Sequence, residues 1–216
     1  MYDNSWCPNR EQCRANSTSY VRALHASPDA PAVDIYVNDR LVARGLRYRE
    51  FTPYVPIAGG LYNIKVYPTG TNTNPVINKN VNIPPNSIFT VAATGMLKDI
   101  DLTLIPEPPV KKQPYDTFVR FVQLSPNAPN VDLYLSNGNR LFTDVEYKEI
   151  TDYLPIRPGV YEFQVKPTGT QNVILTVPNA NLRQGNVYSI YMIGLQNGNP
   201  SLQVLIPLDG STYLNP

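Results

Sequence analysis

Few residues in this sequence have the types and spacing that acid–base or nucleophilic chemistry requires. The chain has 216 residues but only one histidine, His25, and Ser27 follows it two positions later. A serine nucleophile needs a base held beside it, so these two residues are the first candidates for a hydrolytic site. A second, similar stretch keeps the serine as Ser125 but has Gln123 in place of the histidine. We therefore interpret the serines as turn residues and predict that the protein is not an enzyme.

Patterns that hold metals, phosphates or cofactors are also missing from the sequence. A zinc site needs a set of Cys and His ligands, and one histidine with a C-x5-C pair does not supply it. The aspartates follow no EF-hand spacing, and Asp29 of the first stretch becomes Asn127 in the second. No glycine-rich loop leads into a helix that would bind phosphate. We expect no metal and no cofactor.

Both cysteines lie in an N-terminal arm, residues 1–19, that occurs only once in the chain. Cys7 and Cys13 pair either within one chain or between chains, and the arm offers Tyr2 and Trp6 as apolar groups. An extended segment of this kind can cover the open edge strand of a neighbouring sheet. Disulfides in an oxidising exterior would then lock the contact. We predict that the arm docks on another copy of the chain and that Cys7 and Cys13 stabilise the assembly.

The remainder of the chain is a duplication. Residues 20–37 match 118–135, and "YVPIAGGLYNIKVYPTGT" (54–71) matches "YLPIRPGVYEFQVKPTGT" (153–170). Between the copies lies "PEPPVKKQPYD", whose prolines favour an extended spacer. The predicted organisation is an arm (1–19), a first repeat (20–106), a linker (107–116), a second repeat (117–207) and a C-terminal tail (208–216).

Each repeat shows the alternation that is typical of β-strands. In "LYNIKVY", Tyr62, Ile64 and Val66 alternate with Asn63 and Lys65, which indicates a strand with one buried and one wet face. Turn sequences such as "PTGT", "SNGN" and "RQGN" separate the apolar stretches. We therefore predict an all-β fold of two tandem immunoglobulin-like or transthyretin-like β-sandwiches.

Two charged residues recur inside the predicted strands. Arg22 and Asp34 of the first repeat correspond to Arg120 and Asp132 of the second. An aspartate between apolar neighbours could bind a ligand, but an unpaired buried charge is costly. We predict structural ion pairs, Arg22 with Asp34 and Arg120 with Asp132, that hold neighbouring strands in register. Several tyrosines also recur; aromatic rows can stack on sugar rings, although those that share the core face are better suited to closing a sandwich.

The stretches "YVRALHASPDAPAVDIYVN" (20–38) and "GLYNIKVYPTGT" (60–71), with the closing "IDLTLI" (100–105), resemble a family of domains of unknown function, number 4397. The second repeat carries the same landmarks less closely. The resemblance implies a β-sandwich module that often occurs in tandem in bacterial envelope or secreted proteins, and it supplies no catalytic residues.

Composition narrows the classes of function. Charged residues make up 16% of the chain and the formal net charge is +1, which speaks against nucleic-acid binding. No apolar stretch is long enough for a membrane span, and the N-terminus has no signal-peptide pattern.

The arm with its cysteines, placed before β-sandwiches, is similar in layout to subunits of bacterial endospore appendages and coats. We expect a non-catalytic structural protein that self-assembles into a fibre or layer on a bacterial surface or spore exterior. The alternative is an envelope-associated module, extracellular as a mature form, that binds carbohydrate or other surface proteins.

Overall fold

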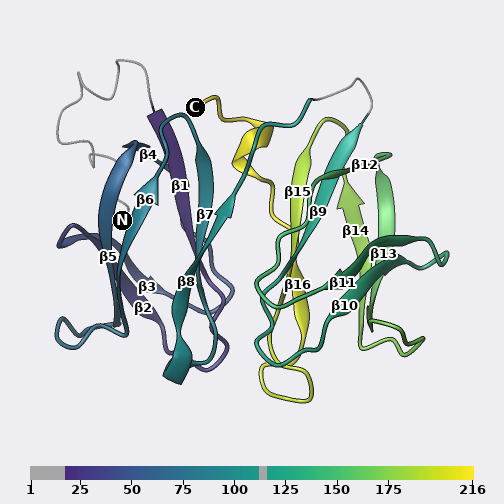
Figure 1. Ribbon diagram of the computed structural model, residues 1–216, viewed down its shortest axis with the longest axis horizontal. Coiled ribbons are helices and arrows are strands. Elements are labelled where there is room, and N and C mark those ends of the chain that lie inside the picture. Colours follow the sequence, from purple (N-terminus) through teal and green to yellow (C-terminus); the bar gives the residue numbers. More distant parts are fainter. Residues whose placement is uncertain (1–17, 112–115) are drawn as a thin grey trace. The chain divides into compact units, whose positions relative to one another are not determined.

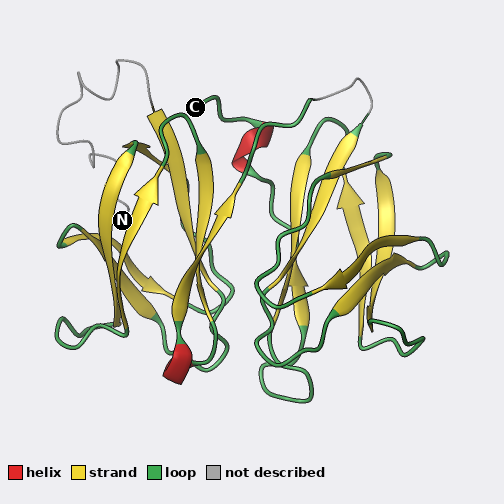
Figure 2. Cartoon of the chain, in the orientation of Figure 1, coloured by secondary structure: helices red, strands yellow, loops and turns green. Residues whose placement is uncertain are grey.

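The computed structural model describes residues 18–111 and 116–216, which form two compact units (Figure 1). The first unit extends to Pro108 and includes Tyr213–Pro216, and the second consists of Pro109–Thr212. Within the described ranges, strands make up nearly all the regular structure (Figure 2), apart from two single helical turns, η2 (Leu97–Asp99) and η3 (Gly210–Thr212). The all-β prediction is confirmed.

The first unit is a sandwich of two four-stranded sheets. One sheet has the order β4-β1-β7-β8 and the other β3-β2-β5-β6. All neighbours are antiparallel except β1 and β7, which are parallel. In chain order the strands are β1 (Thr18–His25), β2 (Val33–Val37), β3 (Arg40–Leu46), β4 (Val55–Ala58), β5 (Gly60–Pro68), β6 (Ile77–Ile83), β7 (Ile88–Thr94) and β8 (Asp101–Pro106).

The second unit repeats this arrangement strand for strand. Its sheets have the orders β12-β9-β15-β16 and β11-β10-β13-β14, and again the first strand, β9, is parallel to the seventh, β15. The strands are β9 (Thr117–Gln123), β10 (Val131–Leu135), β11 (Arg140–Val145), β12 (Leu154–Ile156), β13 (Gly159–Pro167), β14 (Leu175–Leu182), β15 (Val187–Ile193) and β16 (Gln203–Leu205). The two similar halves of the sequence therefore adopt the same fold.

The core of each unit lies between its two sheets. On β5, Ile64 and Val66 are buried and Tyr62 packs against the same apolar cluster, as their alternation predicts. On β1, Val21 and Ala23 pack on this cluster from the opposite sheet. Because side chains alternate along a strand, the residues between them point to the outer face of each sheet.

Two acidic residues that the sequence placed in the linker and the tail belong to the sandwiches. Glu107 immediately follows β8 and is 1% exposed, and Asp209 follows β16 and is 0% exposed. Buried carboxylates are rare unless they are paired. Each therefore marks a polar site inside its repeat.

Candidate functional site

The serine–histidine candidate is a set of turn and core residues. The Ser27 hydroxyl donates to the carbonyl of Gly95 at 2.6 Å, and Ser125 donates in the same way to Gly194 at 2.7 Å. The His25 ring is fully buried, and its Nε2 lies 2.9 Å from the carbonyl oxygen of Pro31. The serine hydroxyls thus tie the turn after the first strand of each repeat to the residue that follows its seventh strand. His25 makes no hydrogen bond to Ser27.

The prediction that each arginine pairs with the aspartate of its own repeat is wrong. Arg22 lies on β1 and Asp34 on β2, and these strands belong to different sheets of the sandwich. The residues on either side of Arg22 and of Asp34 point into the core. The two charged side chains therefore lie on the outer faces of different sheets and point in opposite directions. Arg120 and Asp132 are separated in the same way on β9 and β10, and Asp132 lies 3.5 Å from Nη1 of Arg140 instead.

Arg22 belongs to a buried network on the outer side of its sheet. Its Nε donates a hydrogen bond to Thr90 Oγ1 at 2.7 Å, and the Thr90 hydroxyl in turn donates to Glu107 Oε1 at 2.6 Å. Nη2 of Arg22 lies 3.4 Å from the same carboxylate oxygen, and the Tyr54 hydroxyl donates to both carboxylate oxygens at 2.7 and 2.6 Å. The guanidinium also stacks on the rings of Phe51 and Tyr54, each 4.6 Å from Cζ.

The second repeat reproduces the network with different residues. Arg120 Nε donates to Ser189 Oγ at 2.6 Å, and Ser189 donates to Asp209 Oδ2 at 2.6 Å. Asp209 also accepts from Tyr153 and lies 3.5 Å from Arg120 Nη2. In both units the arginine, the hydroxyl residue and the acid are at most 5% exposed. In each unit the buried arginine is neutralised by the acid and held by hydrogen bonds. This arrangement indicates a structural role.

The sequence contained a signal for the two acids. Each repeat ends in Ile-Pro, and an acid follows immediately in the first copy as Glu107 and one residue later in the second as Asp209. The extra Leu208 shifts the acid by one position, and the change from Glu to Asp hides it further. An acid one or two positions after the closing Ile-Pro is thus the feature that the two copies share.

Asp34 holds the loops around its own sheet. Its carboxylate accepts hydrogen bonds from the Gly45 amide at 2.7 Å, the Thr69 hydroxyl at 3.1 Å and the Gly70 amide at 3.2 Å. Gly45 has a φ of 66°, a left-handed conformation that suits a residue without a side chain. Asp34 therefore fixes the bend in β3 and the "PTGT" turn after β5.

Asp132 has the corresponding role in the second repeat. Burial alone would raise the pKa of Asp132, but hydrogen bonds outweigh this effect and lower it below its ordinary value. The donors are the amide of Asp144 at 2.8 Å and the hydroxyls of Thr168, Tyr134 and Thr143 at 3.0, 3.2 and 3.3 Å. The carboxylate thus has its acceptor capacity filled by its own domain.

The outer face of β2, β5 and β6 has a different character, with aromatic and amide groups accessible to solvent. The rings of Tyr36 and Tyr67 meet edge to face, with centroids 5.3 Å apart, and both side chains are half-buried. Asn63 Nδ2 donates to Oδ1 of Asn78 at 3.0 Å and of Asn80 at 2.9 Å. We call these five residues the tyrosine–asparagine face.

One ion pair borders this face. Lys65, which lies opposite Tyr36 on the neighbouring strand, contacts Asp39 at 2.6 Å. The hydrogen bond from Lys65 to Asp39 raises the pKa of the lysine, so its ammonium group stays charged and is balanced by the carboxylate. The face as a whole is polar and close to neutral.

On the equivalent face of the second repeat, a lysine side chain covers the tyrosine ring. Lys166 occupies the place of Tyr67, and its Nζ lies 4.6 Å above the ring of Tyr134. Glu162 stands where the first repeat has Asn63, and it accepts from Gln164 at 3.5 Å. The aromatic pair with neighbouring amides is thus a property of the first repeat.

The recurring tyrosines Tyr62 and Tyr161 have structural contacts. The Tyr62 hydroxyl donates to the carbonyl of Ala58 at 2.7 Å, and Tyr161 donates to Arg157 at 2.7 Å, while both rings pack on their cores. The predicted docking and disulfide residues Tyr2, Trp6, Cys7 and Cys13 lie outside the described residues. Within the described part of the chain no three acidic, histidine or cysteine side chains gather as a metal site, and no helix is long and apolar enough to cross a membrane.

The fold and these sites define a tandem β-sandwich protein. The model of the family "Domain of unknown function (DUF4397)" matches residues 19–134 and 117–212, and the chain belongs to this family. The tandem arrangement of the family domain, expected from the repeated motifs, is confirmed. No curated protein matches the chain.

Three solved structures resemble this chain at low similarity. The Bacillus anthracis TIE protein is 10% identical with a TM-score of 0.26, over 83% of this chain and 34% of its own. A family CBM26 module of Eubacterium rectale Amy13K, solved with maltoheptaose, is 9% identical with a TM-score of 0.28, over 90% and 99%. A streptococcal virulence factor described as binding alpha-glucan is 11% identical with a TM-score of 0.27, over 92% and 100%. The chain thus spans about a third of the TIE protein and nearly all of the other two.

Proposed function

We propose that the protein is a non-catalytic binding module that acts outside the cell and binds a neutral polysaccharide on the tyrosine–asparagine face of its first repeat. The observation that carries the proposal is the Tyr36–Tyr67 pair beside the amides of Asn78 and Asn80. The apolar faces of sugar rings stack on aromatic rings, and sugar hydroxyls pair with amide groups, which both donate and accept.

The hydrogen bonds of the face favour this use. The NH2 group of Asn63 donates hydrogen bonds to the Oδ1 atoms of Asn78 and Asn80, and these bonds orient both side chains. Their own NH2 groups make no hydrogen bond to the described residues, and both side chains are exposed. An ordered row of donors on neighbouring strands suits a chain of repeating hydroxyl groups better than it suits an irregular protein surface.

Charge favours a neutral ligand over an anionic one. The chain has a net charge of +1, and the lysine nearest the face is paired with Asp39. An anionic polysaccharide would require a cluster of basic side chains, because its attraction depends on several nearby positive charges.

Affinity gel electrophoresis of the full chain tests the proposal. Soluble α-glucan, β-glucan, xylan and mannan are each cast into native gels, and at least one should retard the protein. Tyr36→Ala and Tyr67→Ala should each weaken binding by roughly threefold to tenfold, as expected for loss of one aromatic contact. The matched control Tyr134→Ala, on the second repeat, should bind like the parent. Lack of retardation in every gel, or equal loss in the control, would overturn the proposal.

The expected assembly through the N-terminal arm stays a prediction. It rests on Cys7, Cys13, Tyr2 and Trp6, and no described residue bears on it. Sedimentation under oxidising conditions decides it: the intact chain should form multimers that a reductant dissolves, and a chain without residues 1–19 should not. Identical sedimentation of the two chains would exclude assembly through the arm, whatever the outcome of the polysaccharide gels.

A further inference from the structure

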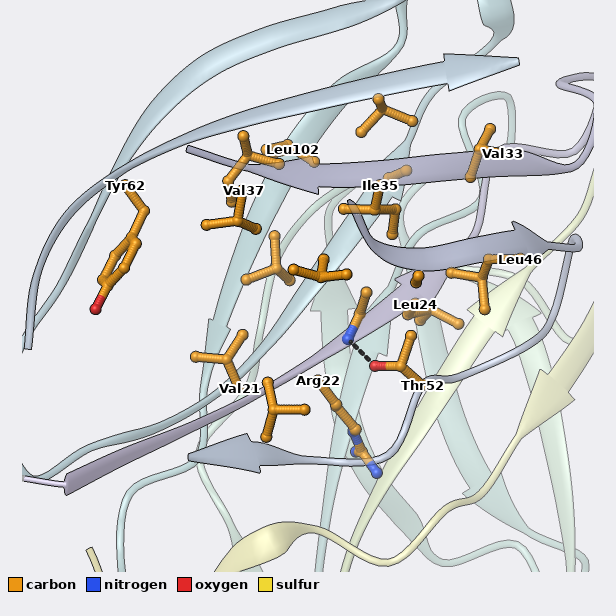
Figure 3. Close-up of a pocket in the computed structure, with 18 of the residues that line it drawn as sticks. Val21, Arg22, Leu24, Val33, Ile35, Val37, Leu46, Thr52, Tyr62 and Leu102 are labelled. Carbon is orange, nitrogen blue, oxygen red and sulfur yellow. Dashed lines mark hydrogen bonds between the residues drawn. The ribbon is translucent and has the colours of Figure 1, made fainter. Parts of the chain in front are cut away.

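A cavity of about 110 Å³ lies within the first repeat, between its two sheets. Figure 3 shows Val21 of β1 on one side and Val37 and Ile35 of β2 on the other. Most of the residues that line it are aliphatic. The guanidinium of Arg22 points away from this cluster (Figure 3), toward the buried network already described.

The cavity reaches the surface along one side of the sandwich. Its lining includes the exposed Arg40 on edge strand β3 and the exposed Pro53 just before edge strand β4. On the opposite side β6 and β8 are joined by Lys79, which contacts Asp101 at 2.8 Å. A small molecule could therefore enter between β3 and the segment that leads into β4.

The sequence explains why the space is there. Ala23 pairs with Val91 across β1 and β7, and at this register the second repeat has Phe121 paired with Ile190. Ala43 lies opposite Ile35, and the second repeat has Phe142 opposite Leu133. Two further positions change in the same direction, Ala93 to Met192 and Ile64 to Phe163.

In the second repeat the larger side chains fill the equivalent region. The rings of Phe121 and Phe142 stack with centroids 6.4 Å apart, where the first repeat has Ala23 and Ala43. A void in a core lowers stability in proportion to its volume. The same fold can thus be built with or without the cavity, and the first repeat keeps it although closing it would be stabilising.

One polar residue that borders the cavity has a ring atom without a partner. His25 borders the cavity and is fully buried, and its Nδ1 has no hydrogen-bond partner among the described residues. Nε2 lies 2.9 Å from the Pro31 carbonyl, which can only accept, so Nε2 carries the proton and Nδ1 is the acceptor. A buried acceptor without a donor is costly, and a ligand hydroxyl would satisfy it.

From the size, the aliphatic lining and this acceptor, we propose that the core of the first repeat binds a small, uncharged, mainly apolar molecule with one hydroxyl group, about the size of phenol. Apolar cavities of about 150 Å³ are known to take up benzene, so the space suits a single ring. This site is separate from the tyrosine–asparagine face, which lies on the outer side of β2 and β5, and it does not depend on the proposed polysaccharide binding.

Methyl NMR on the full chain provides the test, with phenol as the probe. Phenol added to about 10 mM should give saturable shifts with roughly millimolar affinity, as expected for a ligand of this size. The shifts should be confined to cavity methyls such as those of Val33, Ile35 and Leu102, and the equivalent methyls of Val131 and Leu133 should not move. Absence of saturable shifts, or equal shifts in both repeats, would overturn the proposal.

Exchanging residues between the repeats makes the test reciprocal. Ala23→Phe, and separately the milder Ala93→Met, should fill the cavity and abolish the shifts while raising the melting temperature of the first repeat. Phe121→Ala should open a cavity in the second repeat and produce new phenol shifts at Val131 and Leu133. If a filled variant folds and still gives the parent shifts, phenol binds elsewhere and the proposal fails; if neither filled variant folds, the Phe121→Ala result decides.

The role of His25 is tested by the choice of probe. His25→Leu removes the acceptor, so the preference for phenol over benzene should fall by about threefold to tenfold while benzene binding remains. An unchanged preference would mean that the site takes apolar molecules without regard to a hydroxyl, which overturns that part of the proposal.

Discussion

The two repeats share the same strand order, the same parallel pairing of first and seventh strands and the same buried arginine network, but they differ in the core and on the outer face. The first repeat has small residues in the core and paired tyrosines outside, and the second has stacked phenylalanines inside and a lysine over its tyrosine. The comparison separates what the fold requires from what each copy can vary. Features present in both copies are expected to control stability, and features of one copy are the candidates for binding.

The largest effect is expected in the arginine networks. Glu107→Leu leaves Arg22 buried without its carboxylate and should destabilise the first repeat by about 3–5 kcal/mol. Asp209→Leu should do the same to the second repeat through Arg120. Urea titrations followed by NMR signals from each repeat measure both.

Two controls separate charge from packing. Tyr54→Phe removes the hydroxyl that donates to both carboxylate oxygens of Glu107, but it leaves the ion pair in place and should cost only about 1 kcal/mol. Replacing Arg22 and Glu107 together by apolar residues should recover most of the loss, because no charge is then left unpaired. If the Glu107→Leu variant unfolds at the parent urea concentration, the network has no stabilising role.

A smaller effect is expected at the two aspartates that hold the turns. Asp34→Asn and Asp132→Asn each weaken several hydrogen bonds from backbone amides and hydroxyls, and should lower the free energy of unfolding by about 1–3 kcal/mol. Thermal melts give the loss, and the polysaccharide gels should be unchanged. A variant with parent stability but lost binding would make the aspartate a ligand-binding residue.

The pH dependence should differ between the repeats. Burial lowers the pKa of His25, although the Pro31 carbonyl and the Glu50 carboxylate oppose this effect. The unfolded chain therefore takes up the proton more readily, and the stabilisation is complete above the unfolded pKa of about 6.5 and is lost as the pH falls below it. The chain has no other histidine, so the first repeat should weaken between about pH 7 and 5 and the second should not.

The second repeat should respond at a lower pH. The pKa of Asp132 is lowered, so its stabilisation is complete above the unfolded value of about 3.9 and is lost as the pH falls toward the folded value. Melts of His25→Gln and Asp132→Asn across this range check both windows. A first repeat whose stability does not change between pH 7 and 5 would contradict the assignment for His25.

The smallest effect is expected at two equivalent exposed positions. Leu61 and Val160 are 67% and 66% exposed at the same place in the two repeats. Leu61→Ser and Val160→Ser should each change stability by less than about 0.5 kcal/mol. A larger loss in either would show that the side chain is covered by another surface in solution, which sedimentation of the parent and the variant would then identify.

The sequence by itself determined the duplication, the all-β character and the two sandwiches, because alternation along a strand and turn residues are local properties. It also assigned residues such as Ile64 and Val66 to the core, since parity alone separates the two faces of a strand. The recurrence of Arg22 and Asp34 in the second repeat indicated that both residues have a structural role. The sequence could not show which residues they contact.

Only the tertiary structure decided which strands share a sheet, and that decision separated Arg22 from Asp34 and brought Glu107 to the arginine from the far end of the repeat. The same holds for both candidate binding sites. The tyrosine–asparagine face requires β2, β5 and β6 to be neighbours, and the cavity requires Ala23 of one sheet to face Ala43 of the other. Contacts between residues distant in the chain depend on strand order and sheet packing, which no local pattern specifies.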